Sequence, residues 1–363
     1  MHRGLLAILL TLVSALTLSS QELEWSVDMN AVFNNREGGD EETPDQTFIF
    51  TRITPQIGVS MDSARHRIMG GVTWYQPMND HLHGYKVLPS LYYMYKDDKK
   101  GYKFAIGVIP DAIKMPKFLQ SDSLNYVNPN IKGFMIDVHK PHFYFLSWLN
   151  WRQLRTKNHR EAFDVTGQVF WLKHFNENNS LKAGGLVRYN HLAKSYDYSD
   201  PTQGVVDNFN INPQVEYSHQ WNNGYFGATA GILISCDHDR HFPKWHKPVG
   251  FLGNLKGNWK WITINEDIYA GDRQMPLYDN FSTLLYQGDQ FYHNKFYSRT
   301  DLIATIFNRD YLNLEVKLTY HVTEKVTAFW QQLAVRFYLD KNLWKQYRNK
   351  KKGGDYLPLQ PLF

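Results

Sequence analysis

From residue 23 onward, the chain alternates between apolar and polar positions. Every odd position from 23 to 33 is apolar, and every even position up to 30 is polar. Successive side chains of a strand point to opposite faces, so this run predicts a β-strand with one apolar and one polar face. A second run, 49–59, places three isoleucines and a valine on one face, opposite Arg52, Thr54 and Gln56.

About sixteen segments of this character continue to residue 339, and their connections alternate in length. Short turns such as Asn223-Gly224 follow the even-numbered segments, and Gly and Asn supply the positive φ that tight hairpins need. Membrane-spanning barrels have short periplasmic turns and long extracellular loops. The pattern therefore predicts an all-β fold, a transmembrane antiparallel β-barrel of about 16 strands, with roughly 14–18 possible. The short connection at 323–325 departs from this rhythm, and a soluble β-sandwich or propeller is the alternative fold.

The first twenty residues have the parts of a secretory signal peptide. They begin with His2 and Arg3, continue with an apolar run over 5–16, and end in Ser19 and Ser20. No later apolar run reaches the roughly 20 residues that a membrane helix needs. We therefore expect an exported protein whose barrel crosses the cell outer membrane many times. The expected divisions are a signal peptide over 1–20, the barrel over 21–340 and a basic C-terminal tail over 341–363.

Composition adds three constraints. Aromatic residues make up 15% of the chain, which suits the aromatic girdles at the two membrane interfaces of a barrel. Cys236 is the single cysteine, so we expect no internal disulfide in this exported chain. The net charge of +5 is modest and comes partly from the basic tail, so nucleic acid is not an expected partner.

Charged residues lie on the faces of the predicted strands that oppose the apolar rows. A Lys or Arg at the bilayer midplane costs about 2–4 kcal/mol, so these side chains are expected to face a wet lumen. Rings of charge select permeants in channels, whereas paired charges would stiffen a closed barrel, and both interpretations stay open. The candidate lumen-lining residues are Glu24, Asp28, Arg52, Arg67, Arg188, Glu216, Arg299, Asp301, Glu315, Lys317 and Arg336.

Two other segments contain residue types that are used in metal binding or catalysis. The cluster 236–241, with His246 nearby, contains cysteine, aspartate and histidine, but its spacing matches no standard metal site, and we interpret it as a polar loop. The segment 217–222 has Trp221 where a membrane lipase needs its serine. We therefore predict no catalytic residue, no metal, no cofactor and no enzymatic activity. The loop 271–294 is a candidate constriction if it folds inward, and an exposed lid is equally consistent with its sequence.

Three stretches carry a family resemblance: the hairpin GFMIDVHKPHFYFLSWLNWRQ at 133–153, the segment 267–302, and the amphipathic strands over 312–340. They resemble the porin-like outer-membrane β-barrels of the Bacteroidetes. With the predicted lumen, this favours a channel for passive diffusion of small hydrophilic solutes. The alternatives are a non-conducting structural or adhesion barrel that acts through its outer loops and, less favoured, a lipid hydrolase. Expected partners are outer-membrane lipid, small hydrophilic solutes and the barrel-assembly machinery, with the oligomeric state left open.

Overall fold

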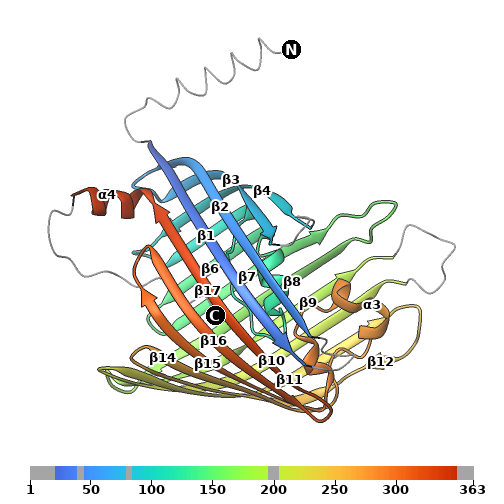
Figure 1. The fold of residues 1–363 in the computed structure, drawn as a ribbon. Helices are drawn as coiled ribbons and strands as arrows, with labels where there is room; N and C mark the ends of the chain where they lie inside the picture. The colour runs from blue at the N-terminus through green and yellow to red at the C-terminus, as the bar shows by residue number, and fades with distance from the viewer. Residues whose placement is uncertain (1–20, 39–44, 79–83, 195–203, 350–363) are drawn as a thin grey trace.

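Sixteen antiparallel strands form a closed barrel in the computed structural model, which describes residues 21–38, 45–78, 84–194 and 204–349. The ring closes at β1, which pairs with β2 on one side and with β17 on the other (Figure 1). β12 is a two-residue strand that pairs with the end of β11. The predicted transmembrane barrel is therefore confirmed. The predicted signal peptide and the last residues of the predicted tail lie outside the described residues.

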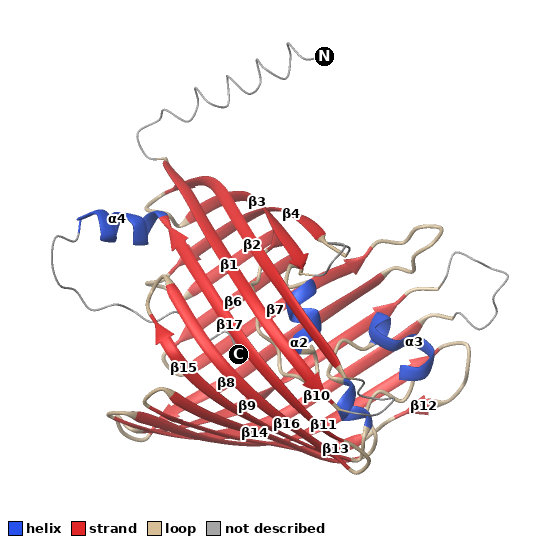
Figure 2. Ribbon diagram, in the orientation of Figure 1, coloured by secondary structure: helices blue, strands red, loops and turns tan. Residues whose placement is uncertain are grey.

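The strands follow one another around the ring in chain order, and the helices lie in or after the connections (Figure 2). The strands are β1 Glu22–Glu37, β2 Gln46–Met61, β3 His66–Pro77, β4 Lys86–Asp97, β5 Tyr102–Ile109, β6 Ile131–Lys140, β7 Phe143–Gln153, β8 Ala162–His174, β9 Asn179–Leu192, β10 Val206–Trp221, β11 Gly224–Asp239, β12 Trp245–His246, β13 Val249–Trp259, β14 Ile262–Gly271, β15 Phe296–Asn308, β16 Leu312–Thr323 and β17 Thr327–Asp340. The helical segments are α2 Asp122–Val127, α3 Tyr278–Leu285, the 3₁₀ helix η1 Gln290–His293 and α4 Lys341–Asn349.

The two faces of the strands differ as the alternation predicts. On β9 and β10, Val187, Phe209 and Val215 are exposed, whereas Arg188 and Asn208 at alternate positions are almost fully buried. The bilayer core offers no water to backbone N–H and C=O groups, so a sheet that spans it must close on itself. A closed ring with an apolar outer face is an outer-membrane barrel.

The two ends of the barrel differ in the length of their connections. Tight hairpins join the strands at one end, which we call the turn end; there Gly101 has φ +65°, and a Cβ at this position would lie 1.9 Å from the carbonyl oxygen of His139. The other end, the loop end, carries the long connections 110–130 and 272–295 and the short one at 324–326. In membrane barrels the long loops face the cell exterior. In the described ranges no helix is long and apolar enough to cross a membrane.

An ion pair joins the first and last strands of the ring. Arg336 of β17 donates to Asp28 of β1 through Nη2 at 2.5 Å and through Nε at 3.1 Å, and both side chains are largely buried. Removing one partner leaves the other poorly solvated. We expect Arg336→Gln to lower the free energy of unfolding by about 1–3 kcal/mol. Urea titration of the refolded barrel, followed by tryptophan fluorescence, measures this, and Asp28→Asn in the R336Q background should cost little more. Equal stability of wild type and R336Q would show that the pair does not support closure.

Candidate functional site

Residues 110–130, between β5 and β6, leave the wall and cross the lumen; we call this segment the crossing loop. It contains α2, which lies inside the ring of strands in Figure 2. Arginines of the wall hold it from opposite sides, because β1 and β2 lie across the ring from β9. They are Arg36 on β1, which donates to Ser123; Arg52 on β2, which donates to Asp111 and to the carbonyl of Asn125; Arg188 on β9, which donates to the carbonyl of Leu119; and Arg299 on β15, which donates to Asp122.

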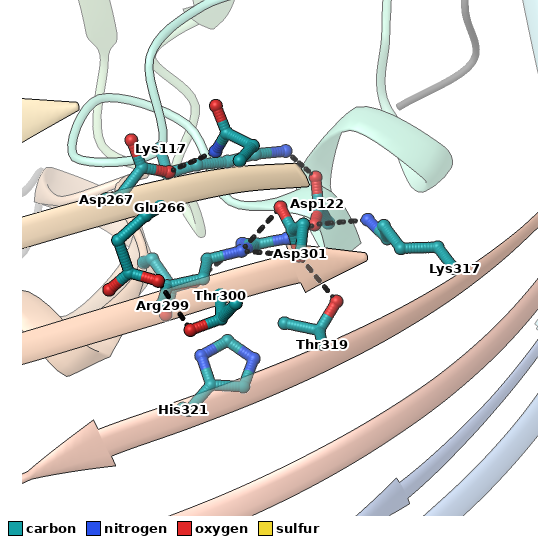
Figure 3. Close-up of polar contacts among 12 residues, drawn as sticks. Lys117, Asp122, Glu266, Asp267, Arg299, Thr300, Asp301, Lys317, Thr319 and His321 are labelled. Atoms are coloured by element: carbon teal, nitrogen blue, oxygen red, sulfur yellow. Dashed lines mark hydrogen bonds and ion pairs between the residues drawn. The ribbon is translucent and has the colours of Figure 1, made fainter. Parts of the chain in front are cut away.

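Asp122 is the main charged anchor of the crossing loop (Figure 3). Its Oδ2 accepts from Arg299 Nη2 at 2.9 Å and lies 3.6 Å from Lys317 Nζ, and its Oδ1 contacts Lys117 of the same loop. Arg299 also donates through Nε to Asp301 at 3.1 Å. Burial acts to raise the pKa of Asp122, but the charges of Lys117, Lys317 and Arg299 together lower it well below its ordinary value. The carboxylate therefore stays ionised.

The loop 272–295, between β14 and β15, also folds inward; we call it the cap loop. Its Tyr286 donates to Asp237 of β11 at 2.6 Å, and its Phe291 stacks on His321 with ring centroids 4.4 Å apart. It is bonded to the crossing loop, because the amide of Asp289 donates to the carbonyl of Lys117 at 2.8 Å. Of the two interpretations of this segment, the inward fold is the one observed.

The crossing loop leaves a cavity on each of its two sides. One has a volume of about 320 Å³ and the other about 240 Å³, and Met115 and Lys117 border both. The larger cavity is lined by residues of β10 to β15, among them Asn212, Gln214, Thr229, Asn254, Lys256, Asn265, Asp267 and Asp301. The smaller cavity lies against β1, β2 and β17 and includes Asn30, Arg52, Asp111, Lys114, Asp122 and Arg336.

The eleven predicted lumen charges all lie on strand faces opposite the exposed apolar rows, and they form separate groups along the barrel. Arg299, Asp301 and Lys317 gather around Asp122, and Arg52 and Arg188 hold the crossing loop. Asp28 and Arg336 form the ion pair that joins β1 to β17. Nearer the turn end, Glu24 accepts from Ser60 and Lys341, Arg67 donates to the carbonyl of Ala64, Glu216 contacts Lys182, and Glu315 accepts from Asn313.

Sequence reasoning missed the residues of the crossing loop that meet these charges. Asp122 and Lys117 belong to a connection that the sequence presents as one long loop among several. A signal was available, because Ile113, Phe118 and Leu119 make this loop unusually apolar for a surface segment. Loops rich in apolar residues need a surface to pack against, and here that surface is the barrel interior.

The segment 236–241 does not place its cysteine, aspartate and histidine side chains on one face. Most of it belongs to β11, so its side chains alternate between faces: Asp237 is buried on the lumen side, whereas His238 stacks on Trp245 with centroids 4.1 Å apart. Among the residues described, no cluster of three metal-ligating side chains occurs. His219 of the lipase-like segment lies near the turn end and contacts Asn179.

A polar cluster lies on the outer face of β9 and β10 at the loop end; we call Tyr189, His191, Asp207 and Arg240 the rim cluster. The Oδ1 of Asp207 lies 2.9 Å from His191 Nδ1 and accepts from the Tyr189 hydroxyl at 2.7 Å. Its Oδ2 accepts from Arg240 Nε at 2.6 Å. Sequence reasoning missed this cluster, although polar residues at lipid-facing positions are exceptions that the alternation makes visible.

The barrel is similar to solved outer-membrane structures. The outer membrane protein OpdK of Pseudomonas aeruginosa matches with a TM-score of 0.54 at 9% identity, over 88% of this chain and 99% of that chain. OccAB2 of Acinetobacter baumannii matches with a TM-score of 0.52 at 10% identity, over 88% of this chain and 98% of that chain. Identities this low show the fold alone. No curated protein matches this chain.

A family model described as Lipid A 3'-O-deacylase-type matches residues 15–346. The resemblance to porin-like barrels is therefore supported at the level of the outer-membrane barrel. The prediction of no enzymatic activity is wrong, because the matching family is named for an enzyme. Since the match spans nearly the whole chain, this protein belongs to the Lipid A 3'-O-deacylase-type family.

Proposed function

We propose that this protein is an outer-membrane channel through which small hydrophilic solutes diffuse past the crossing loop. The observation that carries the proposal is the pair of cavities, about 320 Å³ and 240 Å³, on the two sides of that loop, each lined by both polar and apolar side chains. Barrels of about 16 strands are wide enough to enclose an aqueous path. Cavities of a few hundred cubic ångströms are the size that small ligands occupy.

The wall of the larger cavity favours uncharged, hydroxyl-rich solutes. Its carboxamides, on residues such as Asn212, Gln214 and Asn254, each offer a donor and an acceptor. Such groups replace water around a hydroxyl without requiring a charge on the solute. The acidic and basic side chains in the same wall, Asp267 and Lys256 among them, are of both kinds, so the cavity carries no strong bias toward one kind of ion.

The charged contacts of the crossing loop fix the width of the path. Hydrogen bonds between ionised partners are roughly twice as strong as neutral ones, and arginine holds a planar geometry. Arg52 and Arg188 donate hydrogen bonds to backbone carbonyls of the loop, while Arg299 donates to the carboxylate of Asp122. In this proposal, the crossing loop therefore forms a constriction of fixed position in the lumen.

Single-channel recording in a planar bilayer tests the channel directly. We expect stable ohmic steps from the refolded wild type. Asp122→Asn leaves Arg299 and Lys317 without their shared carboxylate, a loss of about 3–5 kcal/mol for a buried pair, so the steps should become larger and noisier. Asp98→Asn removes the same charge at the turn between β4 and β5 and should change nothing. If protein whose folding is verified by heat-modifiable gel migration gives no conductance steps, the proposal is refuted.

The pH dependence of conductance tests the anchor. A carboxylate with a depressed pKa stabilises the fold at pH values above its unfolded pKa, and this stabilisation is lost as pH falls toward the folded value. Because the pKa of Asp122 is held well below its ordinary value, conductance should be constant from pH 7 to 5. We expect noise to rise only below about pH 4 in wild type, with a weaker change in D122N. A transition between pH 5 and 6 would contradict this role for Asp122.

The rim cluster and the family together favour a second candidate function, hydrolysis of an acyl ester of an outer-leaflet lipid. In the tautomer of His191 that carries the proton on Nδ1, this N–H donates to Asp207, and Nε2 is the basic nitrogen. Water bound at Nε2 would lose a proton to it while the water oxygen attacks the ester carbonyl carbon. The imidazolium then returns that proton to the alcohol oxygen as the ester C–O bond breaks. Tyr189 and Arg240 orient Asp207 in this scheme.

Release of fatty acid from lipid A in vesicles, followed by mass spectrometry, tests the hydrolase. We expect His191→Gln to reduce the rate at least about 100-fold, the usual contribution of a general base, with unchanged conductance. His219→Gln at the turn end is the matched control and should retain activity. Full activity of H191Q, or no release by the wild type, would remove the rim cluster from consideration.

A further inference from the structure

A third cavity lies at the loop end, between the cap loop and the turn that joins β16 to β17. Its volume is about 460 Å³, larger than either lumen cavity, and it shares no lining residue with them. Its lining includes Phe291, which is buried and stacks on His321 of β16. Because the linings share no residue, side chains of this cavity can be changed without changing the walls of the two lumen cavities.

The cavity wall combines an aromatic ring with planar polar side chains. Tyr278 is half-buried, and it is held in place by ring contacts with His293 at 6.0 Å and with Tyr286 at 6.3 Å. Asp279 and Gln290 stand beside it in the lining. An aromatic face packs against the C–H face of a sugar ring, while carboxylate and carboxamide groups bond its hydroxyls in both directions. This combination is suited to a saccharide.

The wall carries two basic side chains, Arg273 and Lys325, and one acidic side chain, Asp279, so basic groups outnumber acidic ones. Arg273 and Lys325 line the cavity, and the Arg273 side chain is 50% exposed. The nearby carboxylate of Glu324 accepts the backbone amides of Lys295 and Phe296 at 3.1 and 3.0 Å, so its oxygens have other partners besides Arg273. Arg273 lies 3.8 Å from Glu324, too far for a strong hydrogen bond. The guanidinium can therefore turn toward a carboxylate or phosphate of a ligand.

We propose that this cavity binds an acidic saccharide, with its ring against Tyr278 and its anionic group at Arg273. The shared chemistry is a hydroxylated ring that carries a carboxylate or phosphate. The site lies at the loop end, which in membrane barrels faces the cell exterior. Such a ligand would reach it from solution or from neighbouring surface glycans. It goes beyond channel activity and does not depend on it.

Saturation-transfer NMR and titration of the refolded full chain with D-glucuronate and D-glucose test the proposal, because these probes differ in one carboxylate. We expect saturable binding of glucuronate, about tenfold tighter than glucose. Arg273→Gln should remove that preference and leave glucose binding unchanged, while Tyr278→Ala should weaken both. Lys99→Gln, the same charge change at the turn end, is the control.

Several results would overturn the proposal. These are equal affinity for the two sugars in wild type, unchanged preference in R273Q, or an equal loss in K99Q. Glucose 1-phosphate, titrated beside glucuronate against the wild type, then distinguishes phosphate from carboxylate as the preferred anion. Heat-modifiable gel migration confirms that each variant is folded, so loss of binding cannot be mistaken for loss of the barrel. Bilayer conductance, measured in parallel, should be the same in wild type, R273Q and Y278A, which separates this site from the channel.

Discussion

The need to satisfy backbone hydrogen bonds where there is no water is the constraint on which the rest of the structure depends. It forces the sheet to close at the β1–β17 seam, and closure creates an interior that can hold charge. Charged side chains in that interior then need partners. Arg299 and Lys317 are almost fully buried on the lumen side, and buried charges need partners. The crossing loop supplies Asp122 to both.

The wall supplies hydrogen-bond donors to the crossing loop, and the loop supplies acceptors to the wall. The loop has little regular secondary structure beyond α2, so its carbonyl groups need donors from elsewhere. Arg52 and Arg188 provide them, and Arg188 in addition lies 3.5 Å from Asp164 of β8. Because replacing buried ion pairs with apolar residues is often neutral for stability, the arrangement is better understood as fixing one loop position than as strengthening the barrel. A fixed position is what a selective constriction requires.

The sequence was sufficient to predict the barrel because the alternation has a period of two and depends on neighbouring residues alone. Its first two alternating runs, 23–33 and 49–59, fall inside β1 and β2, whose observed ends lie one to four residues further out. It could not pair Arg299 with Asp122, which lies 177 positions away, since no local pattern encodes that contact. It also read 236–241 as a loop, whereas β11 continues to Asp239 because its residues pair with β10.

The strand pair β9–β10 carries a different polar pair on each of its two faces. Asn190 and Asn208 bond to each other on the lumen side at 3.1 Å, while His191 and Asp207, one residue away along each strand, meet on the outer face. The pleat keeps these pairs on opposite sides of a wall one strand thick. A lipid in the outer leaflet and a solute in the lumen therefore reach different side chains of the same two strands. Membership of a family named for a deacylase is thus compatible with the proposed solute path, because substitutions on one face of the wall need not disturb the other.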